Sequence, residues 1–452
     1  DYIGNTIGGA CFNLYEVKSN NKERASLVGL DLSHGDRWKI EDHLEELALL
    51  ANTAGAVVID KIIQERNKID PAYFIGYGKA KSISLLAQES KADLLIFDDD
   101  LSPAQVRNLE RLSGKKILDR SGLILDIFAR RAKTREARTQ VELAQLNYLL
   151  PRLTRQWLHL SRQVGGIGTR GPGETQLEVD RRLIRKRIGS LTKELEKIKN
   201  QQDIRRQSRE EIFKVALVGY TNVGKSTLLN ALTQSEVFVE DRLFATLDAT
   251  IRRLKMSRQV PILLIDTVGF IRKLPHHLVA SFMSTLEEAK VADMLLHVVD
   301  VSHPLFHEQI AVVKDVLRQL QISDKPTIFV FNKVDKLEQR AFLTRLTNEY
   351  QPGVFVSATK GLFLEDLKRE ITKMSTEAVV EMSLSIDIQF SWIVSKIYEL
   401  AEVLEIKYND KDVELKIRSL REKLHAIKSM LEENTNGQHA LSILEKTDKE
   451  NG

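Results

Sequence analysis

The chain has 452 residues, of which 42% are hydrophobic, 29% charged and 6% aromatic, and this composition excludes disordered and collagen-like proteins. At roughly 150 residues per domain, about three domains are expected. No apolar run approaches the roughly 18 to 20 residues of a membrane span, and no secretory signal pattern stands at the start. We therefore expect a cytoplasmic protein without an integral membrane segment. The single cysteine, Cys11, excludes an internal disulfide.

The charge of the chain is unevenly distributed. The net charge is only +4, but residues 127–212 hold 20 Lys and Arg against 10 Asp and Glu, which is a local excess of +10. The remainder of the chain is therefore acidic. A segment that carries all of the basic character indicates an arm that binds a polyanion.

Residues 1–128 are predicted to form an N-terminal α/β domain. Short β-like runs alternate with helical stretches between residues 24 and 128, which indicates a parallel sheet covered by helices. The segments in chain order are 26–32, 41–52, 56–63, 79–89, 93–97, 103–112 and 116–119. We interpret the triplet Asp98-Asp99-Asp100 as a solvated loop rather than a metal site.

Residues 129–211 are predicted to form a basic antiparallel helical hairpin. Apolar residues recur every three or four positions from Leu143 to Val164, and a second helical seam consists of Leu177, Ile184, Ile188, Leu191, Leu195 and Ile198. Pro151 should break the first of these helices. The segment that joins them, 164–173, has five glycines in ten residues and is longer than the about two to five residues that such a connection requires.

Residues 212–376 are predicted to form a second α/β domain, and residues 377–452 a small α+β module with a polar tail. In the second domain, strands are expected at 213–218, 262–265, 294–299, 327–331 and 354–356. In the C-terminal module, β-like runs are expected at 382–387 and 413–417, and helices at 392–404 and 420–431. The fold class is therefore multidomain α/β.

A nine-residue stretch between an apolar strand and a helical run matches the pattern G-x-x-x-x-G-K-[ST], and this context indicates a P-loop. Backbone N–H groups at the start of the helix would face the phosphates of a nucleotide, Lys225 would reach its β- and γ-phosphates, and the Ser226 hydroxyl would ligate Mg²⁺. The stretch consists of Gly219, Tyr220, Thr221, Asn222, Val223, Gly224, Lys225, Ser226 and Thr227.

Three further motifs follow later predicted strands. The first carries an acid, Asp266, that can hold magnesium through water and a glycine, Gly269, whose N–H can meet a γ-phosphate. In the second, Asp335 can accept both the ring N–H and the exocyclic amine of guanine, which adenine lacks. These motifs predict a domain that binds and hydrolyses GTP. Their residues are Asp266, Thr267, Val268 and Gly269, then Asn332, Lys333 and Asp335, then Ser357, Ala358 and Thr359.

The catalytic residues are predicted to be Lys225, Thr246 and Gly269, and the magnesium ligands Ser226, Thr246 and Asp266. Thr246 lies in the stretch where a GTPase needs a threonine for Mg²⁺ and the γ-phosphate, with Thr250 as the alternative.

Two positions bear on hydrolysis. Phe270 stands where many GTPases place a glutamine that orients water, so slow intrinsic hydrolysis is expected, completed by another element or a partner. Asn222 lies where potassium-stimulated GTPases place a cation ligand, which makes K⁺ a candidate cofactor, and bracing of the P-loop is the alternative.

The stretch Gly165-Gly166-Ile167-Gly168-Thr169-Arg170-Gly171-Pro172-Gly173-Glu174-Thr175-Gln176-Leu177-Glu178, together with 125–128, 140–146 and 180–182, resembles signatures of the HflX family of ribosome-associated GTPases. The resemblance covers nearly the whole chain. It implies a GTPase that binds the large ribosomal subunit and its rRNA and inserts the arm near the peptidyl-transferase centre, where it splits or rescues stalled ribosomes under stress. It also implies a second nucleotide site in the N-terminal domain, for which the candidates are Gly76, Gly78 and Lys79; a plain glycine turn is the alternative.

A glycine-rich tip on a basic hairpin can enter a crowded anionic cleft, whereas the alternative is a flexible hairpin loop. The arginines expected to contact RNA are Arg162, Arg170, Arg181, Arg182 and Arg185. An alternative function is that of a GTP-switched regulatory protein that acts on a protein or membrane target. Salt-dependent association would favour RNA, and salt-insensitive association would favour this alternative.

Overall fold

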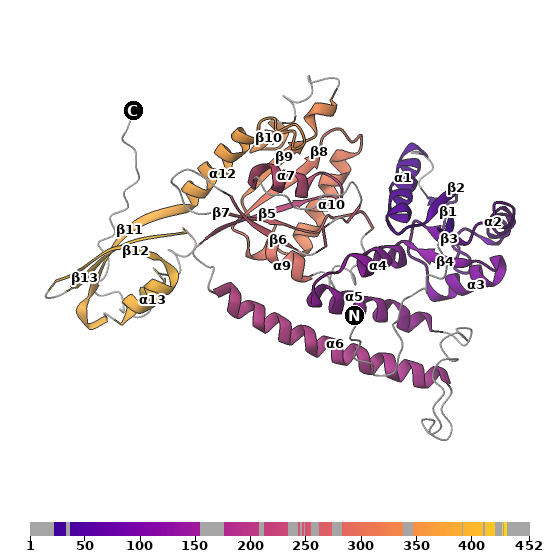
Figure 1. Cartoon of the computed structure of the whole chain (residues 1–452), viewed down its shortest axis with the longest axis horizontal. Coiled ribbons are helices and arrows are strands. Elements are labelled where there is room, and N and C mark those ends of the chain that lie inside the picture. The colour runs from indigo at the N-terminus through magenta and orange to yellow at the C-terminus, as the bar shows by residue number, and fades with distance from the viewer. Residues whose placement is uncertain are drawn as a thin grey trace, which may run out of the picture.

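The structure is a computed structural model that describes most of the chain between residues 22 and 431. The described residues are 22–32, 37–153, 176–207, 212–233, 243–244, 246–247, 249–254, 262–273, 283–337, 346, 348–390, 392–409, 412–420, 427 and 429–431. The predicted tip at 164–173 lies outside them, as do Arg162, Cys11 and the tail after residue 431. Three sheets follow one another along the chain, and the six-stranded sheet lies between the other two (Figure 1).

The first sheet is parallel throughout, as predicted, with the strand order β2-β1-β3-β4. Its elements are β1 (Arg24–Asp31), α1 (Arg37–Thr53), β2 (Val57–Glu65), α2 (Tyr77–Glu89), β3 (Leu94–Phe97), α3 (Pro103–Ser113), β4 (Lys116–Asp119) and α4 (Arg120–Arg131). The uninterrupted apolar run of β3 is buried along its whole length, which suits a parallel strand covered on both faces. α3 begins with a capping box between Ser102 and Gln105 and ends at Gly114, whose φ is 66°.

The basic arm is an antiparallel pair of helices, which lie side by side in Figure 1. It comprises α5 (Arg135–Leu149), the short helix η1 (Leu150–Arg152) and α6 (Gln176–Gln207). Arg135 pairs with Glu194 at 2.6 Å, and Glu142 pairs with Arg187 at 2.7 Å, so the two helices run in opposite directions. α5 ends at Leu149, just before Pro151, as expected for a residue that cannot continue the helix. The apolar seam between the helices includes Leu146, Leu153, Ile184 and Leu191.

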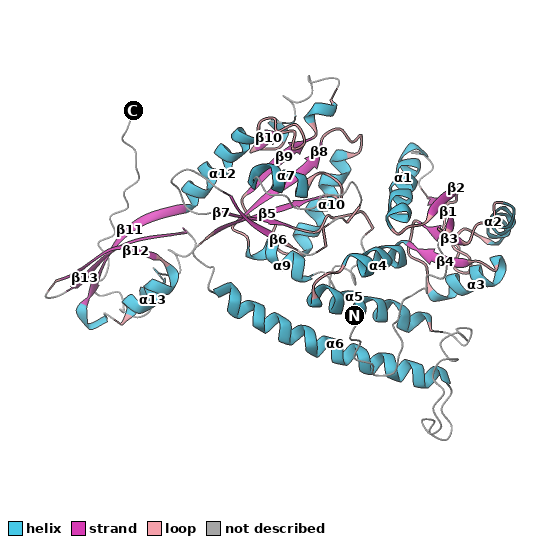
Figure 2. Cartoon of the chain, in the orientation of Figure 1, coloured by secondary structure: helices cyan, strands magenta, loops and turns pink. Residues whose placement is uncertain are grey.

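The second sheet has the order β10-β9-β8-β5-β7-β6, in which only β6 at the edge is antiparallel. Figure 2 shows its strands with helices around them. The elements are β5 (Phe213–Gly219), α7 (Lys225–Thr233), β6 (Thr250–Leu254), β7 (Ile262–Asp266), α9 (Met283–Val291), β8 (Met294–Asp300), α10 (Phe306–Gln319), β9 (Thr327–Asn332), η3 (Val334–Lys336), β10 (Gly353–Phe355) and α12 (Leu364–Ala378). The strand order reverses on either side of β5, and ligands of such sheets bind at the carboxyl ends of the strands beside that point.

The C-terminal module is a three-stranded antiparallel sheet with the order β11-β13-β12, packed on α13. Its elements are β11 (Val379–Asp387), η4 (Ile388–Phe390), α13 (Ile393–Leu400), β12 (Glu402–Tyr408) and β13 (Asp412–Leu420). The predicted helix at 392–404 is therefore wrong at its end, because Glu402 begins a strand. Leu420, the predicted start of the last helix, closes β13 instead. The domain boundaries at 128, 211 and 376 stay predictions.

Within the part of the chain that the structure describes, no helix is long and apolar enough to cross a membrane.

One buried carboxylate fixes the arm to the first sheet. Asp119 has no exposed surface, and its Oδ1 accepts hydrogen bonds from the Gly122 N–H at 2.9 Å and the Tyr148 hydroxyl at 2.7 Å. Its Oδ2 accepts from the Leu101 N–H at 3.2 Å and from Arg152 Nη2 at 2.8 Å. The end of β4, the start of α4 and the end of α5 are thereby joined at one side chain.

Replacing this carboxylate should destabilise the chain strongly. Asp119→Ala leaves the Arg152 guanidinium and three further donors without their acceptor, so we expect the free energy of unfolding to fall by about 3–5 kcal/mol. Glu142→Ala removes only the exposed pair with Arg187 and should cost less than about 1 kcal/mol. Urea denaturation of the full chain measures both values. Equal unfolding midpoints for the two variants would contradict the role of Asp119.

Candidate functional site

The P-loop connects the carboxyl end of β5 to the start of α7. A Cβ atom at Gly219 would lie 2.3 Å from the Val298 carbonyl oxygen, and one at Gly224 would lie 2.5 Å from Asn332 Nδ2. Gly224 also has a φ of 92°, which side chains other than glycine rarely adopt. Gly219 is therefore required by the close approach of a backbone carbonyl, and Gly224 by its backbone conformation and the Asn332 side chain.

Lys225 is the first residue of α7 and is 7% exposed. Its Nζ donates to the Tyr220 carbonyl at 2.8 Å and to the Gly219 carbonyl at 3.3 Å. Burial lowers the pKa of this ammonium group to about 8, and the Asp266 carboxylate acts in the opposite direction. Carbonyl oxygens carry no net charge, so a bound phosphate would supply a counter-charge for this buried cation.

Three oxygen atoms from separate segments meet beside Lys225. Ser226 Oγ lies 2.7 Å from Thr246 Oγ1 and donates to Asp266 Oδ2 at 2.5 Å. Asp266 is fully buried and its Oδ1 has no hydrogen-bond partner among the described residues. Of the two threonines considered, Thr246 lies at this point, whereas Thr250 pairs with Asp266 in the β6–β7 ladder.

This oxygen cluster fits Mg²⁺. Hydroxyl and carboxylate oxygens are the donors that Mg²⁺ prefers, and the ion usually completes its shell with waters and nucleotide phosphates. Among the described residues, no group of three His, Cys, Asp or Glu side chains could hold a metal instead. Ser226, Thr246 and Asp266 would hold the ion, which would neutralise charge that develops on the phosphates.

Asn332, which is 2% exposed, joins the P-loop to the two later motifs that would surround the base. Its Nδ2 donates to the Val223 carbonyl at 2.8 Å, and its Oδ1 accepts from the Ala358 N–H at 3.0 Å. Beside it, the Ser357 hydroxyl donates to Asp335 Oδ1 at 2.6 Å. The P-loop and the two later motifs therefore meet at one end of the sheet, as guanine recognition requires.

Lys333 belongs to the same end of the sheet. Its Nζ donates to the Asn222 carbonyl at 2.8 Å and pairs with Asp300 at 2.6 Å. The sequence interpretation missed Asp300. The only signal in the sequence was the position of this acid at the end of the buried β8 strand.

The segment after Asp266 lies directly on the P-loop. Phe270 N–H donates to the Gly219 carbonyl at 3.0 Å, and the Thr221 N–H donates to the Phe270 carbonyl at 2.7 Å. The Phe270 side chain is 1% exposed. It therefore offers no group that could orient an attacking water.

Residues of the first domain also reach the P-loop, which the sequence interpretation missed. Tyr220 donates its hydroxyl proton to Glu46 in α1. Asp98, which was interpreted as part of a solvated loop, is 3% exposed and is surrounded by cations from both domains. That interpretation was wrong for Asp98, because its partners are distant in sequence.

The candidate second site lies at the start of α2. A cavity of about 550 Å³ is lined there by Gly76, Gly78 and Lys79 together with Arg66. A Cβ atom at Gly76 would lie 1.8 Å from Arg66 Nη1, so the guanidinium group stands over this glycine.

Three family models match successive parts of the chain. They are described as GTP-binding GTPase N-terminal over residues 41–129, GTP-binding GTPase Middle Region over residues 131–209, and 50S ribosome-binding GTPase over residues 214–333. A protein named GTPase HflX from Flavobacterium psychrophilum is 45% identical over 379 residues, which cover 79% of this chain and 92% of that protein. The chain belongs to the HflX family of GTPases.

Other HflX proteins give the same result. The Escherichia coli GTPase HflX is 44% identical over 382 residues, which cover 83% of this chain and 89% of that protein. The Lacrimispora saccharolytica GTPase HflX is 51% identical over 348 residues, which cover 76% of this chain and 81% of that protein. A crystal structure of SsGBP with GDP is 29% identical with a TM-score of 0.46, and covers 78% of this chain and 99% of that one. As a member of the HflX family, the chain is a GTPase, and its fold implies dependence on Mg²⁺.

Asp335 should determine the choice of base. Asp335→Asn removes the carboxylate that accepts two guanine protons, so we expect GTP affinity to fall at least about tenfold and xanthosine triphosphate affinity to rise. Titration with both nucleotides measures the change, and Asp315→Asn, at an exposed carboxylate of α10, is the control. Equal affinity of the unmodified chain for ATP and GTP would contradict the assignment.

Proposed function

We propose that this HflX GTPase binds the large ribosomal subunit and its rRNA, and uses the basic arm near the peptidyl-transferase centre to split or rescue stalled ribosomes under stress. The observation that carries the proposal is the arm itself, a long helical pair with a local charge excess of +10. The match of residues 214–333 to a family described as 50S ribosome-binding GTPases supports it.

The described part of the arm presents cations outward. Arg182, Arg185 and Lys186 are exposed on α6, where they can contact phosphates. Arg181 is half-buried and donates to the Leu153 carbonyl at 3.1 Å, so part of its role is to hold η1 against α6. Arg182 and Arg185 are therefore the better probes of RNA contact.

Reversing charge on the arm should weaken attachment. The double variant Arg182→Glu/Arg185→Glu should lower affinity for large subunits and flatten the dependence of that affinity on salt. Arg369→Glu/Lys373→Glu, at exposed positions of α12, makes the same change of net charge outside the arm. Sedimentation with large subunits at several salt concentrations measures both. Salt-insensitive binding would favour the alternative, a GTP-switched regulatory protein acting on a protein or membrane target.

The tip is tested separately. Gly168→Val/Gly171→Val leaves the charge of the arm unchanged, so GTP binding and salt-dependent attachment should persist, whereas splitting of ribosomes should stop because close backbone approach is blocked. A valine variant that splits ribosomes as well as the unmodified chain would show that the tip is only a hairpin loop.

Hydrolysis by the free chain should be slow, because the buried Phe270 cannot orient water. Large subunits should raise the turnover of GTP by at least about tenfold if they complete the site. Phosphate release with and without subunits measures this. Fast hydrolysis by the free chain, unchanged by subunits, would contradict the proposal.

Two further ligands are proposed. K⁺ is a candidate at Asn222, which is exposed on the P-loop with a φ of 59° and lines a cavity of about 330 Å³ beside Leu243. A second nucleotide is a candidate at Gly76, Gly78 and Lys79, supported by the cavity there and by the basic side chain of Arg66.

A further inference from the structure

Two loops of the GTP site each contain a residue other than glycine with a left-handed backbone. Asn222 of the P-loop has a φ of 59°, and Lys333, at the turn from β9 into η3, has a φ of 65°. Lysine tolerates this region less readily than asparagine. Such a conformation persists only where the surrounding structure holds it, so both residues depend on their partners.

One ammonium group links these two residues. Lys333 Nζ donates to the Asn222 carbonyl at 2.8 Å and pairs with Asp300 Oδ2 at 2.6 Å. The side chains of Lys333 and Asp300 are only 20% and 13% exposed, so salt and water screen their attraction less than that of a surface pair. The carboxylate therefore holds the ammonium group against the P-loop.

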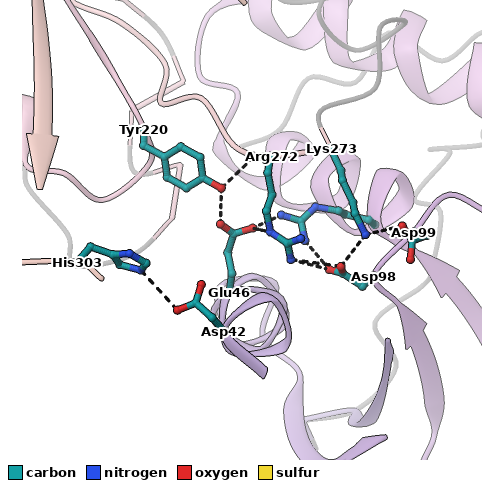
Figure 3. Close-up of polar contacts among 9 residues, drawn as sticks. Asp42, Glu46, Asp98, Asp99, Tyr220, Arg272, Lys273 and His303 are labelled. Atoms are coloured by element: carbon teal, nitrogen blue, oxygen red, sulfur yellow. Dashed lines mark hydrogen bonds and ion pairs between the residues drawn. The ribbon is translucent and has the colours of Figure 1, made fainter. Parts of the chain in front are cut away.

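Asp300 is itself fixed in place at the end of β8. Its Oδ1 accepts hydrogen bonds from the Ser302 N–H at 3.1 Å and the Ser302 hydroxyl at 2.6 Å, and its carbonyl accepts from the His303 N–H at 3.2 Å. The His303 ring at the end of this turn faces Asp42 of α1 (Figure 3). One carboxylate oxygen thus anchors the side chain, and the other is left for Lys333.

The P-loop is a fixed reference for this contact. Its Tyr220 hydroxyl donates to Glu46 and accepts from the Arg272 N–H at 2.9 Å (Figure 3). Asn222 follows two residues later. Lys333 therefore ties its own loop to a segment that other contacts already hold.

The conformation of Lys333 bears directly on the base site. Lys333 stands between Asn332, whose Nδ2 binds the Val223 carbonyl, and Asp335, the expected acceptor of the guanine protons. The backbone at Lys333 sets the direction in which the chain leaves β9. The position of Asp335 relative to the P-loop therefore depends on the contacts that hold Lys333.

We propose that Asp300 is a positioning residue for the guanine nucleotide, which acts through Lys333 to hold the base loop against the P-loop. GDP and GTP share the base and the inner phosphates, so Asp300 slows the release of both to the same extent and leaves the hydrolysis step unchanged. The inference rests on the binding of guanine nucleotides, which needs no ribosome, and so stands apart from the proposed action on ribosomes.

The test is the rate at which fluorescent GDP and a fluorescent non-hydrolysable GTP analogue dissociate from the full chain with Mg²⁺. Asp300→Asn keeps an acceptor for Ser302 but removes the charge that holds Lys333, so both rates should rise by about tenfold and by the same factor. The single-turnover rate of hydrolysis at saturating GTP should stay within about twofold of that of the unmodified chain. A rise confined to the GTP analogue would overturn the proposal.

Asp293, directly before β8, provides the matched control. Its Oδ2 accepts from the Lys214 N–H at 2.7 Å, so it also ties β8 to a neighbouring strand, but at the end of the sheet away from the nucleotide. Asp293→Asn should leave both dissociation rates within about twofold of the unmodified values. Urea denaturation of the nucleotide-free chain compares the stability of the two variants. If Asp300→Asn lowers the unfolding midpoint but leaves both dissociation rates unchanged, Asp300 only stabilises the fold and the proposal is wrong.

A double-mutant cycle tests whether Asp300 acts through Lys333. Lys333→Met removes the ammonium group and keeps most of the apolar stem. Adding Asp300→Asn to Lys333→Met should change the dissociation rates by less than about twofold further, because the interaction is already lost. If the effects of the two substitutions multiply in the double variant, Asp300 acts independently of Lys333 and the proposal is overturned.

Discussion

A guanidinium group without exposed surface fixes the geometry on which the rest of the structure depends. Arg120 keeps its proton and cannot reach water, so its buried charge depends on the carboxylates of Glu46 and Asp98. This requirement holds Glu46 of α1 and Asp98, which follows β3, at fixed positions. Their remaining oxygen lone pairs face the G domain, where Arg272 and Tyr220 bind them. The ion pairs inside the N-terminal domain thereby position the two carboxylates that the G domain contacts.

The GTP site depends on a different constraint, the common edge at which parallel strands end. β5, β7, β8 and β9 all deliver their carboxyl ends there, which places the phosphate, magnesium and base motifs within reach of one nucleotide. Asn332 then ties the base loops to the P-loop through two hydrogen bonds. The segment after Asp266 contacts both the GTP site and the N-terminal domain, because Phe270 is bonded to the P-loop and Arg272 to the first domain.

The sequence was sufficient for the parallel sheets and for the proximity of the GTP motifs, because each motif follows an apolar strand and such strands end at one edge. The sequence was insufficient where a partner distant in the chain determines whether a residue is buried. Three consecutive aspartates appear solvated, yet Asp98 is buried by Arg120, 22 positions away, and by Arg272, 174 positions away. Local pattern also failed at β12, where an irregular register between Val403 and Glu405 disturbs the alternation that marks a strand. Neither the distant partners of Asp98 nor the irregular register of β12 can be inferred from the periodicity of the chain.

The GTP site is the part of the molecule on which its activity depends, and its motifs are joined at one edge of the six-stranded sheet. The most direct measurement is a structure of the full chain with Mg²⁺ and a non-hydrolysable GTP analogue. We expect Asp335 to contact the base, and Ser226, Thr246 and Asp266 to surround the ion. A structure in which the analogue or the ion is bound away from these residues would contradict the site described here.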